Sequence, residues 1–161
     1  MAPKAGDSLP DATLYEGAPD KKVTIKEAFG NKTGVLLGVP GAFTPTCSKD
    51  HLPGFISDYD KFKAAGAEVI VCIAVNDPFV MAAWGEATKA GGKVRLLADT
   101  QLELTKALGT TLDAEGMLGS KRTRRFSAVI KDGKFVTFND EQGGGLSCST
   151  AQVTLDQLKS A

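Results

Sequence analysis

Cys47 stands in a segment, residues 40–48, that separates an apolar run from a predicted helix. Thr44 is expected to cap that helix, with Pro45 as its first residue. Cys47 then falls in the first helical turn, where backbone N–H groups are unpaired and the helix dipole is positive. Such a position stabilises an anion, and the thiolate is the nucleophilic form of cysteine. The sequence therefore predicts a reactive thiol at Cys47, and a small buried apolar residue is the alternative.

The two other cysteines lie in different settings. Cys72 is inside the apolar run 67–75, where a thiol buried in a strand is expected to be inert. Cys148 follows the glycines 143–145, which predict a mobile loop. From spacing alone, Cys148 is either a second redox cysteine or an incidental surface thiol.

Charged and titratable residues offer two further candidates. His51, the only histidine, lies four residues after Cys47 on the same predicted helical face. It is expected to shape the pocket through hydrogen bonds, and a general base for the thiol is the second reading; two ligands alone do not make a structural zinc site. Residues 121–125 include four basic residues, and Arg125 directly precedes an apolar strand. An arginine there would favour a nearby thiolate over the thiol, and a solvated loop is the alternative.

The composition is that of an ordinary globular protein, with 161 residues of which 42% are hydrophobic and 24% charged. This length favours one domain over residues 1–161. The 19 basic and 19 acidic residues give zero net charge, which argues against nucleic-acid binding. No apolar stretch approaches the roughly 20 residues that span a bilayer. Few cysteines and no apolar signal-peptide core indicate an intracellular, reducing location, without distinguishing cytoplasm, mitochondrion and peroxisome.

Apolar runs and helical stretches alternate along the chain. Strands are predicted at residues 33–39, 67–75, 94–97, 126–130 and 135–138. Helices are predicted at residues 45–65, which Pro53 should kink, at 78–90 and 101–108, and after a capping box at 149–152. This alternation implies helices on both faces of a sheet, and the Asp-Gly turn at 132–133 adds an antiparallel hairpin. The pattern indicates an α/β, thioredoxin-like fold with a mixed central sheet.

The residues around Cys47 also carry a family resemblance. Residues 40–48, Pro-Gly-Ala-Phe-Thr-Pro-Thr-Cys-Ser, and 51–55, His-Leu-Pro-Gly-Phe, closely resemble the active-site motif of the peroxiredoxins, and within them the type-5 thiol peroxidases. Pro40, Thr44 and Cys47 match the proline, threonine and peroxidatic cysteine of that motif, and Arg125 matches its arginine. The resemblance covers nearly the whole chain, including residues 75–80, Trp84, 94–99 and 125–127.

The resemblance implies an antioxidant peroxidase that reduces hydrogen peroxide and organic hydroperoxides and needs no metal, haem or flavin cofactor. Cys47 would become a sulfenic acid while Thr44, Arg125 and the Cys47 N–H hold the peroxide oxygens. Pro40 would shield the sulfur from water. Cys148 matches the resolving cysteine of atypical two-cysteine members, which implies an intramolecular disulfide recycled by thioredoxin.

Other readings remain open at this stage. A one-cysteine peroxidase could be recycled by glutathione or another external thiol, and a redox sensor could signal through oxidised Cys47 with slow turnover. The family implies a homodimer formed near the active site, where Phe43, Phe79 and Trp84 are either contact residues or ordinary core. The glycines at 143–145 lack the residues of a phosphate loop, and no CxxC motif occurs, which argues against a nucleotide site and a thioredoxin-type reductase.

Overall fold

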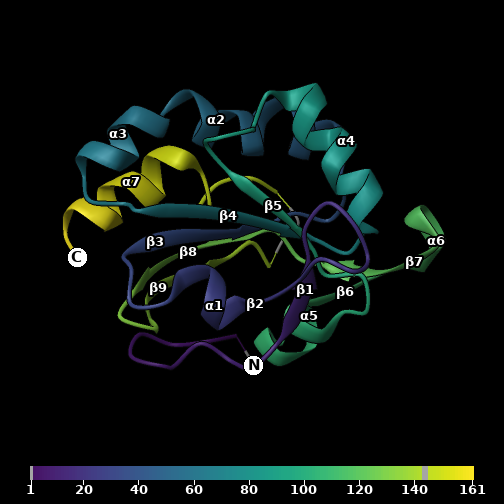
Figure 1. Ribbon diagram of the computed structural model, residues 1–161, viewed down its shortest axis with the longest axis horizontal. Coiled ribbons are helices and arrows are strands. Elements are labelled where there is room, and N and C mark those ends of the chain that lie inside the picture. The colour runs from purple at the N-terminus through teal and green to yellow at the C-terminus, as the bar shows by residue number, and fades with distance from the viewer. Residues whose placement is uncertain (1, 143–144) are drawn as a thin grey trace.

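The computed structural model describes residues 2–142 and 145–161, and in this part of the chain a mixed sheet of seven strands forms the centre (Figure 1). The strands lie in the order β2-β1-β5-β4-β3-β8-β9. Their bounds are β1 Thr13–Tyr15, β2 Lys22–Thr24, β3 Gly34–Gly38, β4 Val69–Ala74, β5 Arg95–Ala98, β8 Phe126–Lys131 and β9 Lys134–Asp140. β3, β4 and β5 are parallel, whereas β1 and β8 pair antiparallel with their neighbours, so the predicted mixed sheet is confirmed.

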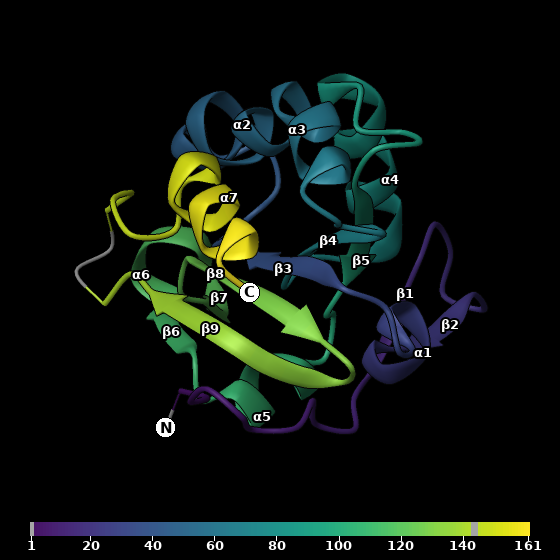
Figure 2. The same ribbon diagram turned by 90° about the vertical axis from the view of Figure 1, so that its left-hand side faces the viewer.

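Helices cover both faces of this sheet (Figures 1 and 2). One face carries α2 (Leu52–Ser57), α3 (Tyr59–Ala64), α4 (Pro78–Thr88) and α7 (Ala151–Lys159), and the other carries α1 (Ile25–Phe29) and α5 (Glu103–Leu108). A separate hairpin, β6 (Thr111–Ala114) and β7 (Ser120–Thr123), is joined by the short α6 (Glu115–Leu118) at one end of the molecule. The layered arrangement is the predicted thioredoxin-like one.

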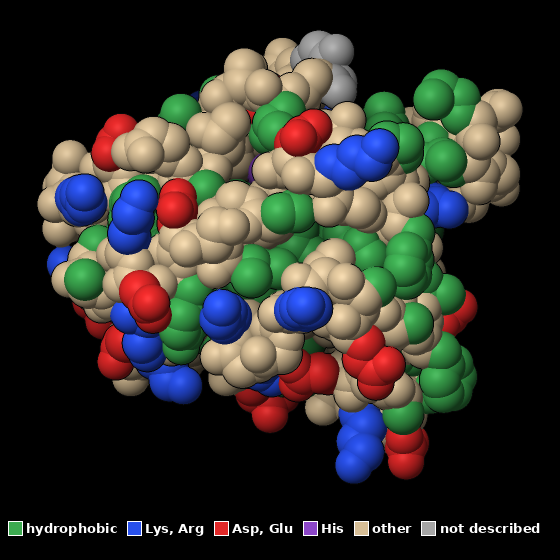
Figure 3. All heavy atoms as spheres, turned by 90° about the horizontal axis from the view of Figure 1, so that it is seen from above, with side chains coloured by type: hydrophobic (Ala, Val, Ile, Leu, Met, Phe, Trp, Pro, Cys, Tyr) green, Lys and Arg blue, Asp and Glu red, His purple; other side chains and the backbone are tan. Residues whose placement is uncertain are grey.

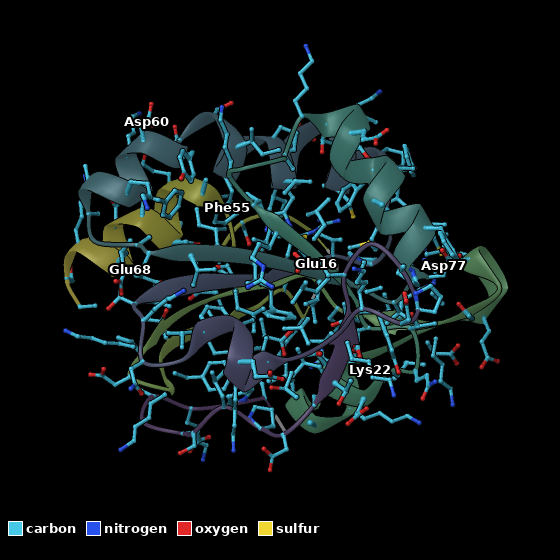
Figure 4. The ribbon with its side chains drawn as sticks, viewed as in Figure 1. Glu16, Lys22, Phe55, Asp60, Glu68 and Asp77 are labelled. Carbon is cyan, nitrogen blue, oxygen red and sulfur yellow. The ribbon has the colours of Figure 1, made fainter. Side chains whose placement is uncertain are left out.

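Two hydrophobic cores follow from the alternation of side chains along the strands. In β4, Cys72 packs in the core under α2, α3, α4 and α7, whereas Val71 and Ile73 pack in the core under α1 and α5. A strand buried on both faces must be apolar throughout, which explains the continuous apolar run in the sequence. Figure 4 shows Phe55 pointing from α2 toward the sheet and Asp60 pointing away from it.

The helix predicted over residues 45–65 is interrupted twice. A π-helical turn, η1 (Cys47–His51), precedes α2, and in it the Leu52 N–H donates to the Cys47 carbonyl. Pro53 has no N–H to continue an α-helical ladder, and the wider turn accommodates this defect at the start of α2. The predicted kink is therefore a π turn, and a second break at Asp58 separates α2 from α3.

Two local predictions can be compared with the backbone. Asp132 and Gly133 both have positive φ, 51° and 74°, as the tight hairpin turn requires. The cap of α7 was predicted at Ser149 and is wrong by one residue: the Thr150 hydroxyl accepts from the Val153 N–H at 3.2 Å. The Ser149 hydroxyl is unavailable because it donates to Glu141. The mobile loop predicted at the glycines 143–145 falls largely on residues 143 and 144, which lie outside the described residues.

The surface on the side of α2, α3 and α4 carries basic and acidic side chains interspersed, with hydrophobic side chains visible between them (Figure 3). This mixture agrees with the equal numbers of basic and acidic residues. Throughout residues 2–142 and 145–161, no helix has both the length and the apolar character needed to cross a bilayer.

Candidate active site

Cys47 lies where the sequence predicts it, at the start of the helical segment that follows β3. The segment begins at Pro45, and its Ser48 N–H donates to the Thr44 carbonyl at 3.0 Å. Cys47 therefore lies in the first turn, among the amides that a helix leaves without intrahelical partners. The Cys47 side chain is buried, and Nη2 of Arg125 approaches its sulfur at 3.3 Å. The structure thus brings a guanidinium and a helix N-terminus to one sulfur.

His51 contacts the other terminal nitrogen of the Arg125 guanidinium. Its Nε2 lies 2.9 Å from the Ser149 carbonyl, and its Nδ1 lies 3.1 Å from Nη1 of Arg125. A carbonyl can only accept and a guanidinium can only donate, so Nε2 carries the proton and Nδ1 is the acceptor. Burial first, and then the charge of Arg125, lower the pKa of His51 to about 4. His51 is therefore neutral with both ring nitrogens engaged, and this geometry favours a positioning role over the general-base reading.

Three contacts hold the loop before Cys47. The Thr44 hydroxyl donates to the Gly41 carbonyl at 2.7 Å, so it does not cap the helix as predicted. Arg122 Nη1 donates to the Pro40 carbonyl at 3.1 Å, and a Cβ at Gly41 would lie 2.7 Å from that same nitrogen. The close approach of the guanidinium therefore requires glycine at position 41. Asn76 lies two residues after β4, and its side-chain oxygen accepts from the Ala42 N–H at 2.9 Å.

Three arginines near the end of the sheet, Arg122, Arg124 and Arg125, bind different partners. Arg122 supports the Pro40 carbonyl, and Arg124 makes a two-bond ion pair with Asp140 at 2.7 and 3.0 Å. Only Arg125 of these three reaches the sulfur, which is the choice that the resemblance favoured. Nε of Arg125 is buried and has no hydrogen-bond partner among the described residues. Pro40 and Arg125 also line a small cavity of about 70 Å³.

The aromatic candidates separate into core and surface. Trp84 is fully buried and donates from Nε1 to the Ser48 hydroxyl at 2.9 Å, so it is core and ties α4 to η1. Phe43 and Phe79 are 54% and 63% exposed. Phe43 also has a φ of 64°, a left-handed conformation that is costly for a bulky side chain. The exposed rings leave Phe43 and Phe79 available for contact with another molecule.

Comparison with known proteins agrees with this geometry. The Redoxin family model matches residues 4–147. The chain is 45% identical to peroxiredoxin-2E-2, chloroplastic, of Oryza sativa subsp. japonica, over 95% of this chain and 71% of that relative. The crystal structure of peroxiredoxin 5 from Alvinella pompejana has a TM-score of 0.89 and 42% identity, over 99% of both chains. The chain belongs to the peroxiredoxins.

A second similar solved structure contains H₂O₂. The reduced Prx3 of Vibrio vulnificus in complex with H₂O₂ is 41% identical to this peroxiredoxin, with a TM-score of 0.90 over 97% of this chain and 99% of that one. Together with the similarity to peroxiredoxin 5, this places the chain with the type-5 members, as the active-site motif predicts. The protein is accordingly a peroxidase, an oxidoreductase of the antioxidant class.

The two other cysteines of this peroxiredoxin differ in burial. Cys72 is fully buried in β4, and burial first, then the proximity of Cys47, raise its pKa well above the ordinary value. Such a thiol is unreactive, as expected from the sequence. Cys148 is partly exposed in the turn before α7, and all three thiols are free. The described residues hold no group of three or more His, Cys, Asp or Glu side chains placed to bind a metal.

Sequence reasoning missed three residues that organise this site. Asn76 and Arg122 fix the loop before Cys47, and the buried carboxylate of Glu141 binds the turn that holds Cys148. Asn76 could have been found, because it follows the carboxyl end of a central parallel strand, where the active-site loops of such sheets gather. Arg122 and Glu141 carry no comparable signal. Pro40 is 82 positions from Arg122, and the contacts of Glu141 depend on how the turn at residues 147–149 folds back toward the end of β9.

Proposed function

We propose that this peroxiredoxin reduces hydrogen peroxide and organic hydroperoxides through a Cys47 sulfenic acid, that Cys148 resolves this acid, and that thioredoxin recycles the enzyme in a reducing compartment inside the cell. The 3.3 Å contact between Arg125 Nη2 and the Cys47 sulfur carries the proposal. The Arg125 guanidinium beside this buried sulfur supplies donors for the oxygens of a bound peroxide.

In the first step the Cys47 thiolate attacks one peroxide oxygen. The S–O bond forms as the O–O bond breaks, the sulfur is oxidised to a sulfenic acid, and the other oxygen takes a proton and leaves as water or an alcohol. Arg125 and the Cys47 amide stabilise the charge that grows on the leaving oxygen. The Thr44 hydroxyl has committed its proton to the Gly41 carbonyl, so its lone pairs remain to accept from the peroxide O–H.

In the second step Cys148 attacks the sulfenic sulfur. An S–S bond forms, the S–O bond breaks, and hydroxide leaves as water after taking the proton released by the Cys148 thiol. Support comes from the turn of Cys148, whose Ser149 carbonyl is bonded to His51 in the same π turn as Cys47. The dithiol of thioredoxin then reduces the disulfide by exchange and is itself oxidised.

A coupled thioredoxin–peroxide assay tests the scheme with matched cysteine variants. Cys47→Ser should abolish peroxide consumption, and Cys148→Ser should form sulfenic acid once but lose turnover with thioredoxin. Cys72→Ala is the control and should keep full turnover, because its thiol is buried and unreactive. Peroxide consumption by Cys47→Ser at the wild-type rate would end the proposal.

Mass spectrometry of the peroxide-treated protein tests the resolving step separately. The scheme expects the loss of two hydrogens and a linked pair of peptides that contain Cys47 and Cys148. A lone sulfenic acid or glutathione adduct on Cys47, with undiminished thiol-dependent turnover of Cys148→Ser, would identify a one-cysteine peroxidase instead.

We also propose that the enzyme forms a homodimer through the exposed rings beside the active site. Phe43 and Phe79 are both largely exposed, and the bond from Ala42 to Asn76 ties together the two segments that carry them. Sedimentation over a range of concentrations should show a dimer that Phe79→Glu dissociates and that Phe79→Leu retains. A wild-type monomer throughout that range would refute the interface.

A further inference from the structure

Glu141, directly after β9, is a buried carboxylate with an unusual set of partners. It is 5% exposed, and its N–H donates to the Arg125 carbonyl at 2.9 Å. Its two oxygens accept the N–H and hydroxyl of Ser147 at 2.6 and 2.9 Å, and those of Ser149 at 2.9 and 2.8 Å. These four bonds come from the residues on either side of Cys148. A single carboxylate therefore holds both flanks of the cysteine.

The charge state of this group follows from its partners. Burial alone would raise the pKa of Glu141, but the four bonds from Ser147 and Ser149 outweigh it and lower the pKa to about 2. Glu141 is therefore anionic at physiological pH. For Cys148, burial first, and then the charge of Glu141 and a hydrogen bond to it, raise the thiol pKa. The carboxylate thus fixes the turn and, after burial, adds to the raised pKa of the thiol.

We propose that Glu141 is a positioning residue that holds Cys148 in place in the reduced enzyme and sets the rate at which Cys148 reaches oxidised Cys47. The inference rests on the proposed resolving role of Cys148. A disulfide needs the two Cα atoms within about 7 Å and the sulfurs in bonding contact. The two sulfurs are not bonded in this structure. In this proposal the turn of Cys148 leaves Glu141 before the S–S bond forms.

The opening of the Glu141 contacts competes with a second oxidation of the Cys47 sulfur. A sulfenic acid that waits can react with another peroxide, which is reduced to water or an alcohol while the sulfur becomes a sulfinic acid. If Cys148 arrives first, the S–S bond forms and the oxygen leaves as water. The ratio of disulfide to sulfinic acid at high peroxide therefore measures how fast the Glu141 contacts open relative to overoxidation.

Alkylation of the reduced protein tests the positioning role without any peroxide. Glu141→Gln should make Cys148 react about tenfold faster with iodoacetamide, because an amide cannot accept four bonds and carries no charge. Ser149→Ala, which leaves the carboxylate in place, should give a smaller increase in the same direction. Glu86→Gln, which removes an exposed carboxylate on α4, is the matched control and should leave the rate unchanged.

Buried Cys72 is an internal reporter in the same experiment, because only general unfolding exposes it. An unchanged Cys148 rate in both Glu141→Gln and Ser149→Ala would overturn the inference. So would a parallel increase at Cys72 in both variants, because that would show loss of stability in place of local release.

Peroxide titration then tests the effect on the reaction. Glu141→Gln should give several-fold more disulfide relative to Cys47 sulfinic acid than wild type, and an unchanged ratio would overturn the claim that Glu141 sets the rate. If the wild type never links Cys47 to Cys148, the proposed resolving role fails and the rate-setting claim fails with it. The alkylation result then shows independently whether Glu141 holds the turn.

Discussion

Protonation of His51 should destabilise this protein as the pH falls from 6.5 to about 4. The imidazole is buried, and its pKa falls from 6.5 to about 4. Between these values the unfolded chain binds a proton that the folded protein does not. Stability therefore falls as pH decreases through this window, with a slope of up to about 1.4 kcal/mol per pH unit. The lowered pKa of His51 corresponds to about 3 kcal/mol of stability at neutral pH, and about 2 kcal/mol of this is already lost at pH 5.

The measurement compares denaturant unfolding of reduced wild type and His51→Gln from neutral pH to about pH 4. Glutamine offers one donor for the Ser149 carbonyl and one acceptor for Arg125, but it does not titrate. The free energy of unfolding of wild type, minus that of His51→Gln, should be about 2 kcal/mol smaller at pH 5 than at neutral pH. The other titrating groups are the same in both proteins, so their effects cancel in this difference. The pKa of Glu141 is lowered from 4.5 to about 2, so its stabilisation begins to be lost near pH 4.5 and is lost fully only near pH 2, and this loss is common to both proteins.

A direct titration gives the result that would refute this reasoning. Because the chain has a single histidine, its imidazole resonances in the NMR spectrum need no assignment. A folded-state midpoint near 6.5, or identical pH slopes for wild type and His51→Gln, would show that the ring is not held neutral between Arg125 and Ser149.

Three further substitutions test the contacts of the active site. Arg125→Met should slow the first reaction with peroxide at least about 100-fold in stopped flow, with only partial recovery in Arg125→Lys, because one point charge cannot replace two guanidinium nitrogens. Thr44→Val should slow the same step about 10- to 100-fold, and Thr44→Ser should restore it; equal rates for valine and serine would disprove a role for the hydroxyl. Gly41→Ala should lower the free energy of unfolding in urea by about 1 kcal/mol, because the added Cβ displaces Arg122 from the Pro40 carbonyl. In an Arg122→Ala background the same substitution should have no effect on that free energy.

The fold was predictable wherever the chain carries long periodic or apolar segments. The five predicted strands of the central sheet and their hairpin are present because strands such as β4 are buried on both faces and read as continuous apolar runs. β1 and β2 have three residues each, too few to show a period. A local signal for α1 did exist, since Thr24 and Glu27 form a capping box.

The site was predictable where its parts are neighbours in sequence. Pro40, Thr44 and Cys47 lie in one short motif, whereas Arg125 is 78 positions from Cys47. Its place before an apolar strand made Arg125 a candidate, and the family resemblance was needed to choose it over Arg122 and Arg124. The hydrogen bonding of Glu141 depends on how a later turn folds back onto the end of β9, so no pattern along the chain indicates it. Likewise, only the three-dimensional contacts of His51 decide between a base and a positioning residue.

The π turn contains one residue more than an α-helical turn, and this residue sets how Cys47 is rotated about the helix axis relative to α2. Successive residues of an α-helix are rotated by about 100°, so closing η1 into a regular helix by deleting one residue would swing the sulfur away from its guanidinium while Phe55 stayed seated in the core. The orientation of the Cys47 sulfur therefore depends on η1, whereas Phe55 in α2 anchors the helix in the core. A change of segment length between Cys47 and Pro53 would therefore move the sulfur relative to Arg125, and it would also disturb the buried side chains of Cys47 and His51 in the same turn.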